Sequence, residues 1–363
     1  MQKKIPICDL HCDTATYFLN RISLNDPVLQ VNLPAMHEAG IGLQVFACYL
    51  PPSIPKGQGF PLVNTLIDSL EDEIGRHAQE MAICRSAAEI ATAQNENKIA
   101  VVISVENGNA IDADLENLQR LYDRGVRLMT IIHARSNEWV ISSNDKNPAF
   151  AGLSEFGRDV IAAMNDLGMI IDVSHAHDIA VEKILQWSRQ PIIASHSCAY
   201  ALCPADRNLK DDLLAGIAEK NGLIGLNLFP YFLDATYYRL SLERAGDLFT
   251  ELSKFEKAAG QDLAKIGQLF TQFSDRFASA MAGHTVKLER YFDHILYLSE
   301  LIGSEYLAFG SDFDGTAALP EGIKDCRALA AVRDGLYERD YSEEEITAIC
   351  WGNFIRVFSS VCK

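Results

Sequence analysis

The stretch GMIIDVSHAHDIAVEKILQWSRQPIIASHS, residues 168–197, decides the predicted fold. It holds two short apolar runs, each closed by a Ser-His pair. Between them lies a segment with apolar residues at helical spacing, which Asp178 is expected to cap. Strand, helix and strand at this length form a βαβ unit, whose two strands run parallel. Parallel strands end at the same edge of a sheet, so His175 and His196 are expected to lie close together there. One strand-end histidine is more often a structural core residue, but two at one edge favour a shared site.

Apolar runs of strand length recur along the chain and mostly alternate with helical segments. No GxGxxG follows the first run, so an α/β fold of the (β/α)₈ TIM-type barrel is favoured over a doubly wound sheet. Residues 1–363 are interpreted as one domain. The predicted strands cover residues 5–13, 41–50, 99–106, 126–133, 168–175, 191–196, 222–229 and 306–312.

Three further segments complete the expected architecture. Residues 62–98 are expected to be helical with one break near residues 84–86, and a helix is expected over residues 322–337. Residues 234–288 precede the last strand and have helical apolar spacing, which predicts a helical insertion. We interpret it as a cover over the edge of the barrel or as a contact between copies. No residue in it suggests a chemical role.

The composition excludes several classes of partner. The formal net charge of −17 argues against nucleic acid or an anionic membrane surface. No apolar segment is long enough for a signal peptide or a membrane span, so no membrane partner is expected. The nine cysteines include no CxxC pair and lie mostly in apolar runs, which is typical of reduced thiols. We therefore expect a cytoplasmic protein, with a removed secretory signal as the alternative.

Residues that can bind metals or transfer protons close six of the eight predicted strands. Barrel enzymes keep their chemistry at this edge, and a set rich in histidine and carboxylate suits zinc, or alternatively manganese, iron or cobalt. Glu106 ends a wholly apolar strand and is our choice for a carboxylate that bridges two metals and allows them to activate a water. Its alternative role is a helix cap or a loop carboxylate. The set is His11, Asp13, Glu106, His133, His175, His196 and Asp312.

Seven segments of the chain resemble one known family. They are DLHCDT at 9–14, SVENG at 104–108, RLMTIIHARSNEW at 127–139, GLSEFGRDVIAAMNDLGMIIDVSH at 152–175, SHSCAYALCPADRNLKDDLL at 195–214, AFGSDFDG at 308–315 and YSEEEITAICWGNFIRVF at 341–358. Over nearly its whole length the sequence is similar to the membrane (renal) dipeptidase family, peptidase family M19, a branch of the amidohydrolase-like metallopeptidases. The resemblance implies a binuclear zinc dipeptidase that hydrolyses L-Xaa-L/D-Xaa dipeptides and forms a homodimer.

The resemblance also implies a role for each site residue. Asp312 would be the acid–base group, His133 a catalytic and substrate-binding histidine near the scissile carbonyl, and Arg207 the group that binds the substrate carboxylate. From its sequence context alone, Arg207 would more often be a surface ion-pair residue. Two zinc ions would be bridged by Glu106, the first held with His11 and Asp13, the second with His175 and His196.

Other residues and functions are weaker alternatives. His177 and Asp314 lie beside predicted ligands but suit a helix start and a turn. The same metal centre could hydrolyse N-acyl amino acids or lactams, and Arg207 together with the insertion would decide between these substrates. An inactive metal-binding scaffold is disfavoured because every predicted ligand and acid–base residue is present.

Overall fold

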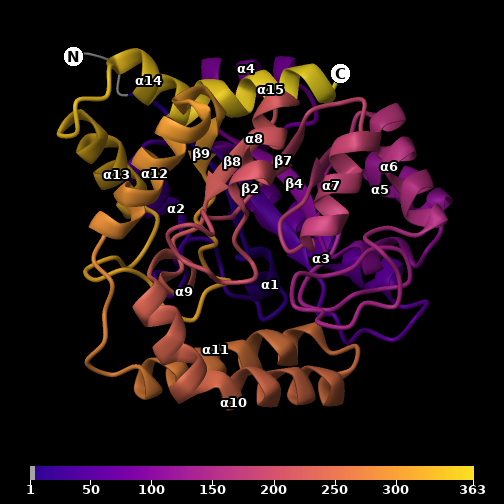
Figure 1. Ribbon diagram of the computed structural model, residues 1–363. Coiled ribbons are helices and arrows are strands. Elements are labelled where there is room, and N and C mark those ends of the chain that lie inside the picture. The colour runs from indigo at the N-terminus through magenta and orange to yellow at the C-terminus, as the bar shows by residue number, and fades with distance from the viewer. Residues whose placement is uncertain (1–4) are drawn as a thin grey trace.

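The computed structural model describes residues 5–363, and its centre is a closed barrel of eight parallel strands (Figure 1). Consecutive barrel strands pair in parallel, and β2 pairs with β4 to close the ring. This confirms the predicted α/β (β/α)₈ architecture. The barrel strands are β1 (Ile7–Cys12), β2 (Ile41–Tyr49), β4 (Ile99–Glu106), β5 (Val126–Thr130), β6 (Ile170–Asp172), β7 (Ile192–Ala194), β8 (Leu223–Leu226) and β9 (Leu307–Phe309).

Helices surround the barrel because each carries an apolar stripe that packs on the strands. The helices of the ring and its connections are α1 (Ala15–Phe18), α2 (Leu33–Ala39), α3 (Gly59–Arg76), α4 (Ala87–Asn95), α5 (Leu115–Arg124), α6 (Glu155–Leu167), α7 (Asp178–Trp187), α8 (Asp211–Glu219), α9 (Pro230–Leu233), α12 (Glu289–Ile302), α13 (Arg327–Tyr337) and α14 (Glu343–Thr347). Among residues 5–363, no helix is both long enough and apolar enough to cross a membrane.

The inside of the barrel is a separate apolar core. Alternate strand residues such as Cys8, Leu10 and Val102 point into it and are fully buried. The last helix, α15 (Asn353–Val361), packs Phe354 and Phe358 against this core. Figure 1 shows α15 across one end of the barrel, in yellow. One barrel end is therefore closed, which leaves the other end for ligands.

The predicted helical insertion covers that other end. It consists of α10 (Ala235–Ala259) and α11 (Leu263–Ala280), which pack side by side and lie across the barrel from α15 (Figure 1). Asp234 caps α10 by accepting hydrogen bonds from the amides of Thr236 and Tyr237. Phe249 of α10 contacts Phe273 of α11 with ring centroids 5.2 Å apart. Of the two predicted roles, the structure shows the cover.

Several predicted boundaries were wrong. The segment expected to be helical over residues 62–98 contains a short strand, β3 (Met81–Ile83), which pairs with the first residues of β4. The first residues of β4 are free to pair with β3 because β5 pairs with β4 only from Ile103 onward. The helix expected over residues 322–337 begins at Arg327. The strands expected to reach residues 175 and 196 end at Asp172 and Ala194, so both histidines lie on turns just beyond them.

The cap of α7 is also corrected. His177, not Asp178, is the capping residue, because its Nδ1 accepts a hydrogen bond from the Ile179 amide at 3.2 Å. Asp178 is the first helical residue, where its negative carboxylate is attracted to the positive end of the helix dipole. Its side chain also pairs with Lys210 at 2.6 Å. The helix start predicted for His177 is thus confirmed.

Candidate metal centre and substrate pocket

The seven predicted strand-end residues converge at the open end of the barrel. His11 and Glu106 are the last or next-to-last residues of β1 and β4, and the others follow within three residues of a strand. Because parallel strands all end at this edge, residues distant in sequence become neighbours. Together they form a nitrogen- and oxygen-rich cluster: His11, Asp13, Glu106, His133, His175, His196 and Asp312.

Glu106 lies between two groups of ligands. Its Oε2 is 3.5 Å from His11 Nε2, while its Oε1 is 3.1 Å from His175 Nε2 and 3.6 Å from His196 Nε2. The two oxygens of one buried carboxylate therefore face different imidazoles. This is the geometry expected of a bridging carboxylate, and it argues against a helix cap or a loop role for Glu106.

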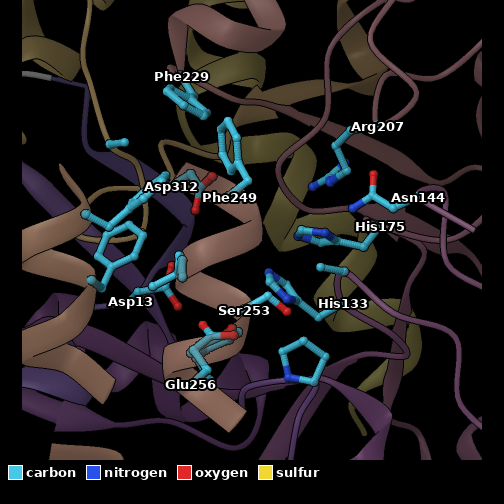
Figure 2. Close-up of a pocket in the computed structure, with 18 of the residues that line it drawn as sticks. Asp13, His133, Asn144, His175, Arg207, Phe229, Phe249, Ser253, Glu256 and Asp312 are labelled. Atoms are coloured by element: carbon cyan, nitrogen blue, oxygen red, sulfur yellow. The ribbon is translucent and has the colours of Figure 1, made fainter. Parts of the chain in front are cut away.

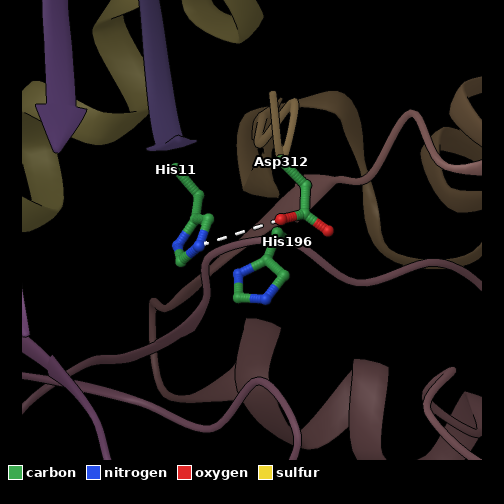
Figure 3. A group of neighbouring side chains, drawn as sticks. All are labelled: His11, His196 and Asp312. Atoms are coloured by element: carbon green, nitrogen blue, oxygen red, sulfur yellow. Dashed lines mark ion pairs between the residues drawn. The ribbon is translucent and has the colours of Figure 1, made fainter. Parts of the chain in front are cut away.

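His11 is enclosed by carboxylates. Its Nε2 lies 3.5 Å from Asp13 Oδ2 and 3.9 Å from Asp312 Oδ1, the pair marked in Figure 3. Neither of its ring nitrogens has a hydrogen-bond partner among residues 5–363, although the side chain is fully buried. An unpaired buried imidazole among carboxylate oxygens is a polar group that a metal cation would satisfy.

The donor atoms fit a divalent metal. Three triads each bring one ligand atom per residue to within 4.8 Å of one another: His11–Asp13–Glu106, Glu106–His133–His175 and His11–His196–Asp312. The first is the predicted first triad. The predicted second triad is also compact, because the Nε2 atoms of His175 and His196 are 3.0 Å apart beside Glu106. Imidazole nitrogen with carboxylate oxygen suits zinc and similar transition metals.

Burial sets the protonation of the cluster. It lowers the pKa of His175 and of His196 well below the usual range, so both are neutral and can donate a lone pair. Burial also raises the pKa of Asp13 to about 6 and of Asp312 to about 7. For His11, burial is opposed by the charges of Glu106 and Asp13, and its pKa rises. Burial therefore opposes the ionisation of Asp13 and Asp312.

A buried aspartate orients His196. Asp172 Oδ2 accepts hydrogen bonds from Ser195 Oγ at 2.6 Å and from Thr130 Oγ1 at 2.5 Å, while Oδ1 accepts from the Ser174 and Ser195 amides. Ser195 Oγ is in turn 2.7 Å from His196 Nδ1. Because the hydroxyl donates to Asp172, it accepts from Nδ1–H of His196. The Nε2 lone pair is then directed at Glu106.

A second buried aspartate holds the turn that carries Asp312. Asp9 accepts hydrogen bonds from the Ser311 amide at 2.8 Å, from Ser311 Oγ at 2.6 Å and from Gln44 Nε2 at 2.9 Å. Asp312 itself has a φ of 62°, and its Oδ2 accepts from Asn227 Nδ2 at 2.8 Å. A strained backbone and a directed amide therefore place the Asp312 carboxyl at the cavity.

A glycine makes room for this arrangement. A Cβ at Gly315 would lie 1.9 Å from Asp13 Oδ2, so any side chain there would displace Asp13. Asp314 plays the predicted turn role, because its carboxylate accepts from Thr14 Oγ1 and from the Gln30 amide. Sequence reasoning missed the supporting residues Asp9, Asp172 and Asn227. Their signal in the sequence is a polar residue within an otherwise apolar strand or at its end.

Arg207 lies inside the site rather than on the surface. It is 7% exposed, donates from Nη1 to Ser197 Oγ at 2.7 Å and from Nη2 to the His196 carbonyl at 2.8 Å, and lines the same cavity as His133 and His175. Its Nε has no partner among the described residues. The surface ion pair suggested by its sequence context is therefore wrong.

The cluster opens into a cavity of about 670 Å³, large enough for a small peptide. One wall is formed by the barrel residues and the other by the insertion, as the close-up in Figure 2 shows for Phe249, Ser253 and Glu256. We expected no chemical role for any residue of the insertion, yet the structure places Glu256 at this cavity. Helical spacing identified α10 as a helix but gave no register against the barrel, so Glu256 could not be distinguished from the exposed acids beside it.

The family assignment follows from comparison with known proteins. The model of the family "Membrane dipeptidase (Peptidase family M19)" matches residues 1–363. The chain belongs to this family. It is 28% identical over 336 residues to Dipeptidase 3 of Mus musculus, which covers 92% of this chain but 58% of that protein. It is 26% identical over 376 residues to Dipeptidase aclJ of Aspergillus oryzae, covering 99% of this chain and 78% of that protein.

A solved structure shares the fold of this M19 chain. The metallo peptidase from Rhodobacter sphaeroides, liganded with a phosphinate mimic of the dipeptide L-Ala-D-Ala, superposes with a TM-score of 0.79 at 23% identity. The likeness covers 99% of this chain and 100% of the other. The two proteins therefore share one fold over almost the full length of both chains.

Proposed function

We propose that this chain is a dipeptidase that uses two zinc ions to hydrolyse the peptide bond of L-Xaa-L/D-Xaa dipeptides. The observation that carries the proposal is the position of Glu106, whose two carboxylate oxygens face His11 on one side and His175 with His196 on the other. The dipeptidase names of the relatives and the dipeptide mimic held by the Rhodobacter sphaeroides protein support the choice of substrate.

The donor set assigns the ligands of each metal. His11 and Asp13 with Glu106 would hold the first zinc ion, and His175 and His196 with Glu106 the second. Bound at this edge, the metal pair would lower the pKa of a water and polarise the scissile carbonyl. Asp172, acting through Ser195, keeps the Nε2 lone pair of His196 available for this purpose.

The remaining polar residues supply proton transfer and orientation. Asp312 is suited to take a proton from the attacking water and to deliver one to the leaving amine, because its pKa of about 7 lies near neutral pH. Burial lowers the pKa of His133 to about 3, so it offers a neutral imidazole that can donate to the carbonyl oxygen. Arg207 presents a fixed guanidinium that matches the terminal carboxylate of a short peptide.

The test combines metal replacement with one substitution. We expect protein depleted of metal to regain dipeptide hydrolysis as zinc is added, with saturation at two ions per chain. Asp312→Asn is expected to bind the same zinc but to lose more than roughly a hundredfold in kcat. Asp159→Asn, an exposed aspartate on α6, is the matched control and should retain full activity.

Two outcomes would redirect the proposal. Zinc bound at two per chain without hydrolysis of any L,L- or L,D-dipeptide would favour the N-acyl amino acid and lactam alternatives, which the same assay can measure. No hydrolysis of those substrates either would favour the inactive scaffold. Failure to bind zinc at all would contradict the metal centre itself.

The domain organisation, location and oligomeric state of the protein are also proposals. We propose that residues 1–363 act as one domain, in the cytoplasm, as a homodimer. Two large apolar residues of the insertion are about half exposed, Leu242 at 47% and Phe255 at 48%, and they would suit a contact between copies. Sedimentation at several protein concentrations measures the oligomeric state, and a monomer at all of them would contradict the dimer.

A further inference from the structure

Glu256 is a carboxyl group that the proposed reaction does not use. It lies near the end of α10, is only 7% exposed and lines the cavity that contains His133, Arg207 and Asp312. The insertion thus turns one acidic side chain inward, although a helix on the surface can place its acids in water. Burying a carboxyl group costs free energy, so its position calls for a physical explanation.

The protein itself does not neutralise this carboxyl. Among residues 5–363, no lysine, arginine or histidine nitrogen lies within 4 Å of the Glu256 oxygens. The Tyr49 hydroxyl is a polar neighbour, and the Arg135 guanidinium acts on Glu256 from a distance while it bonds to Ser253. Burial raises the pKa of Glu256 to about 7. A cation arriving in the cavity would gain a partner here that the fold leaves unpaired.

Most of the rest of the insertion wall is apolar, although Thr250, Ser253 and the exposed Lys254 also line the cavity. Phe249 and Ser253 lie on the same face of α10 as Glu256, and α11 adds Ile266, Phe270 and Phe273 to the lining. Such a wall can bind the carbon chain of a ligand, and its single carboxyl group would fix a positively charged nitrogen at one point. The wall therefore suits an amphipathic group, with an apolar stem and a cationic tip.

Glu256 and Arg207 line separate parts of the cavity. In Figure 2, His133 and His175 lie between them. The ring of Tyr49 contacts that of His133 edge to face, with centroids 4.8 Å apart, and Glu256 is among the charged neighbours of the Tyr49 hydroxyl. Arg207 instead adjoins Ser197 and His196. A dipeptide with its terminal carboxylate on Arg207 would direct its amino-terminal residue toward Tyr49 and Glu256.

We propose that Glu256 is a specificity-determining residue, which binds a positively charged nitrogen of the substrate's amino-terminal residue. This inference rests on the proposed dipeptidase function. The charged nitrogen can be the α-ammonium or the side-chain ammonium of a basic residue, and both have the same chemistry. Glu256 touches neither the scissile bond nor the metal ligands, so its contribution is to binding and selection.

Three substrates, each with one ammonium group fewer than the one before, distinguish recognition of the α-ammonium from recognition of the side-chain ammonium. They are Lys-Ala, norleucyl-Ala, which lacks the side-chain charge, and hexanoyl-Ala, which also lacks the α-ammonium. Each is measured with zinc-loaded wild type, Glu256→Gln and Glu243→Gln, where Glu243 is an exposed acid on the same helix. We expect Glu256→Gln to lower kcat/KM about 10- to 100-fold, chiefly through KM, for each substrate that carries the recognised ammonium. Hexanoyl-Ala should be unaffected.

The pattern of losses decides the matter. A loss for Lys-Ala alone assigns the side-chain ammonium, and an equal loss for Lys-Ala and norleucyl-Ala assigns the α-ammonium. Equal losses for all three substrates, or no loss for any, would overturn the inference. If wild type cleaves none of them, the proposed function fails separately. In that case calorimetry measures the affinity of wild type and Glu256→Gln for Lys-Ala and hexanoyl-Ala. Weaker binding of Lys-Ala alone by Glu256→Gln is the expected result, and equal losses for both ligands, or no loss for either, would overturn the inference.

Discussion

Replacing Glu256 with glutamine is expected to stabilise the protein at alkaline pH. Glu256 on α10 is 93% buried by area, since 7% is exposed, and it lacks an ion-pair partner within 4 Å among the described residues. Ionising such a carboxyl inside the fold costs free energy that ionising it in the unfolded chain does not. Glutamine has nearly the same shape and cannot ionise, so Glu256→Gln removes this cost alone.

The sign and size of the effect follow from the pKa. Burial raises the pKa of Glu256 from an ordinary 4.5 to about 7. Below pH 4.5 both the folded and the unfolded wild type hold the proton, so the two proteins should be equally stable. As the pH rises from 4.5 to 7, the unfolded chain releases the proton first and the wild type loses stability relative to the variant. A difference of about 2.5 pH units at about 1.36 kcal/mol each gives a ceiling near 3 kcal/mol.

The assay is denaturant unfolding of both proteins at equal metal content, at several pH values between 4.5 and 8.5. We expect Glu256→Gln to match wild type at the acidic end and to exceed it by about 1–3 kcal/mol above pH 7. Glu243→Gln should stay within about 0.5 kcal/mol of wild type throughout, because that acid is exposed. A gain that does not vary with pH would indicate a change in packing instead, and no gain at pH 8 would refute the reasoning.

Two further substitutions test the walls of the site. Arg207→Lys keeps the charge but loses the planar fork, so KM for dipeptides should rise about tenfold or more, while C-terminally amidated dipeptides should change little. Equal effects on both substrate types would argue against carboxylate binding. Asp172→Asn disturbs the hydrogen bond that orients His196 through Ser195, and zinc affinity should fall about 10- to 100-fold in competition with a chelator. Unchanged affinity would contradict this positioning role.

The fold was predictable because the barrel strands carry a local signal. Fully buried strands such as β4 read as continuous apolar runs, and their spacing with helices indicates parallel pairing. The short strand β3 gave no such signal, since a run of only three apolar residues, MAI, also fits a helix. Strand β3 forms because the first residues of β4 are left unpaired by β5. This depends on where β5 begins to pair with β4 rather than on the sequence of β3.

The site was predictable to the extent that topology alone brings its residues together. Strand-end residues must meet at one barrel edge, so the convergence of His11, Glu106, His175 and His196 needed no detailed coordinates. The inward position of Glu256 depends instead on the rotation of α10 about its axis. That rotation is set by the packing of Phe249 against α11, a contact between two amphipathic helices that many registers could satisfy.

The barrel and the insertion contribute different properties to the same cavity. The barrel brings carboxylates and imidazoles within a few ångströms, a set that suits hydrolysis of an amide whatever side chains flank it. The insertion brings a largely apolar wall and one carboxyl group whose ionisation opposes folding. A residue that lowers stability near neutral pH is a poor structural choice, because a glutamine or an apolar residue would fill the space at less cost. Glu256 is therefore better explained by the ligand that enters the cavity than by the fold that surrounds it.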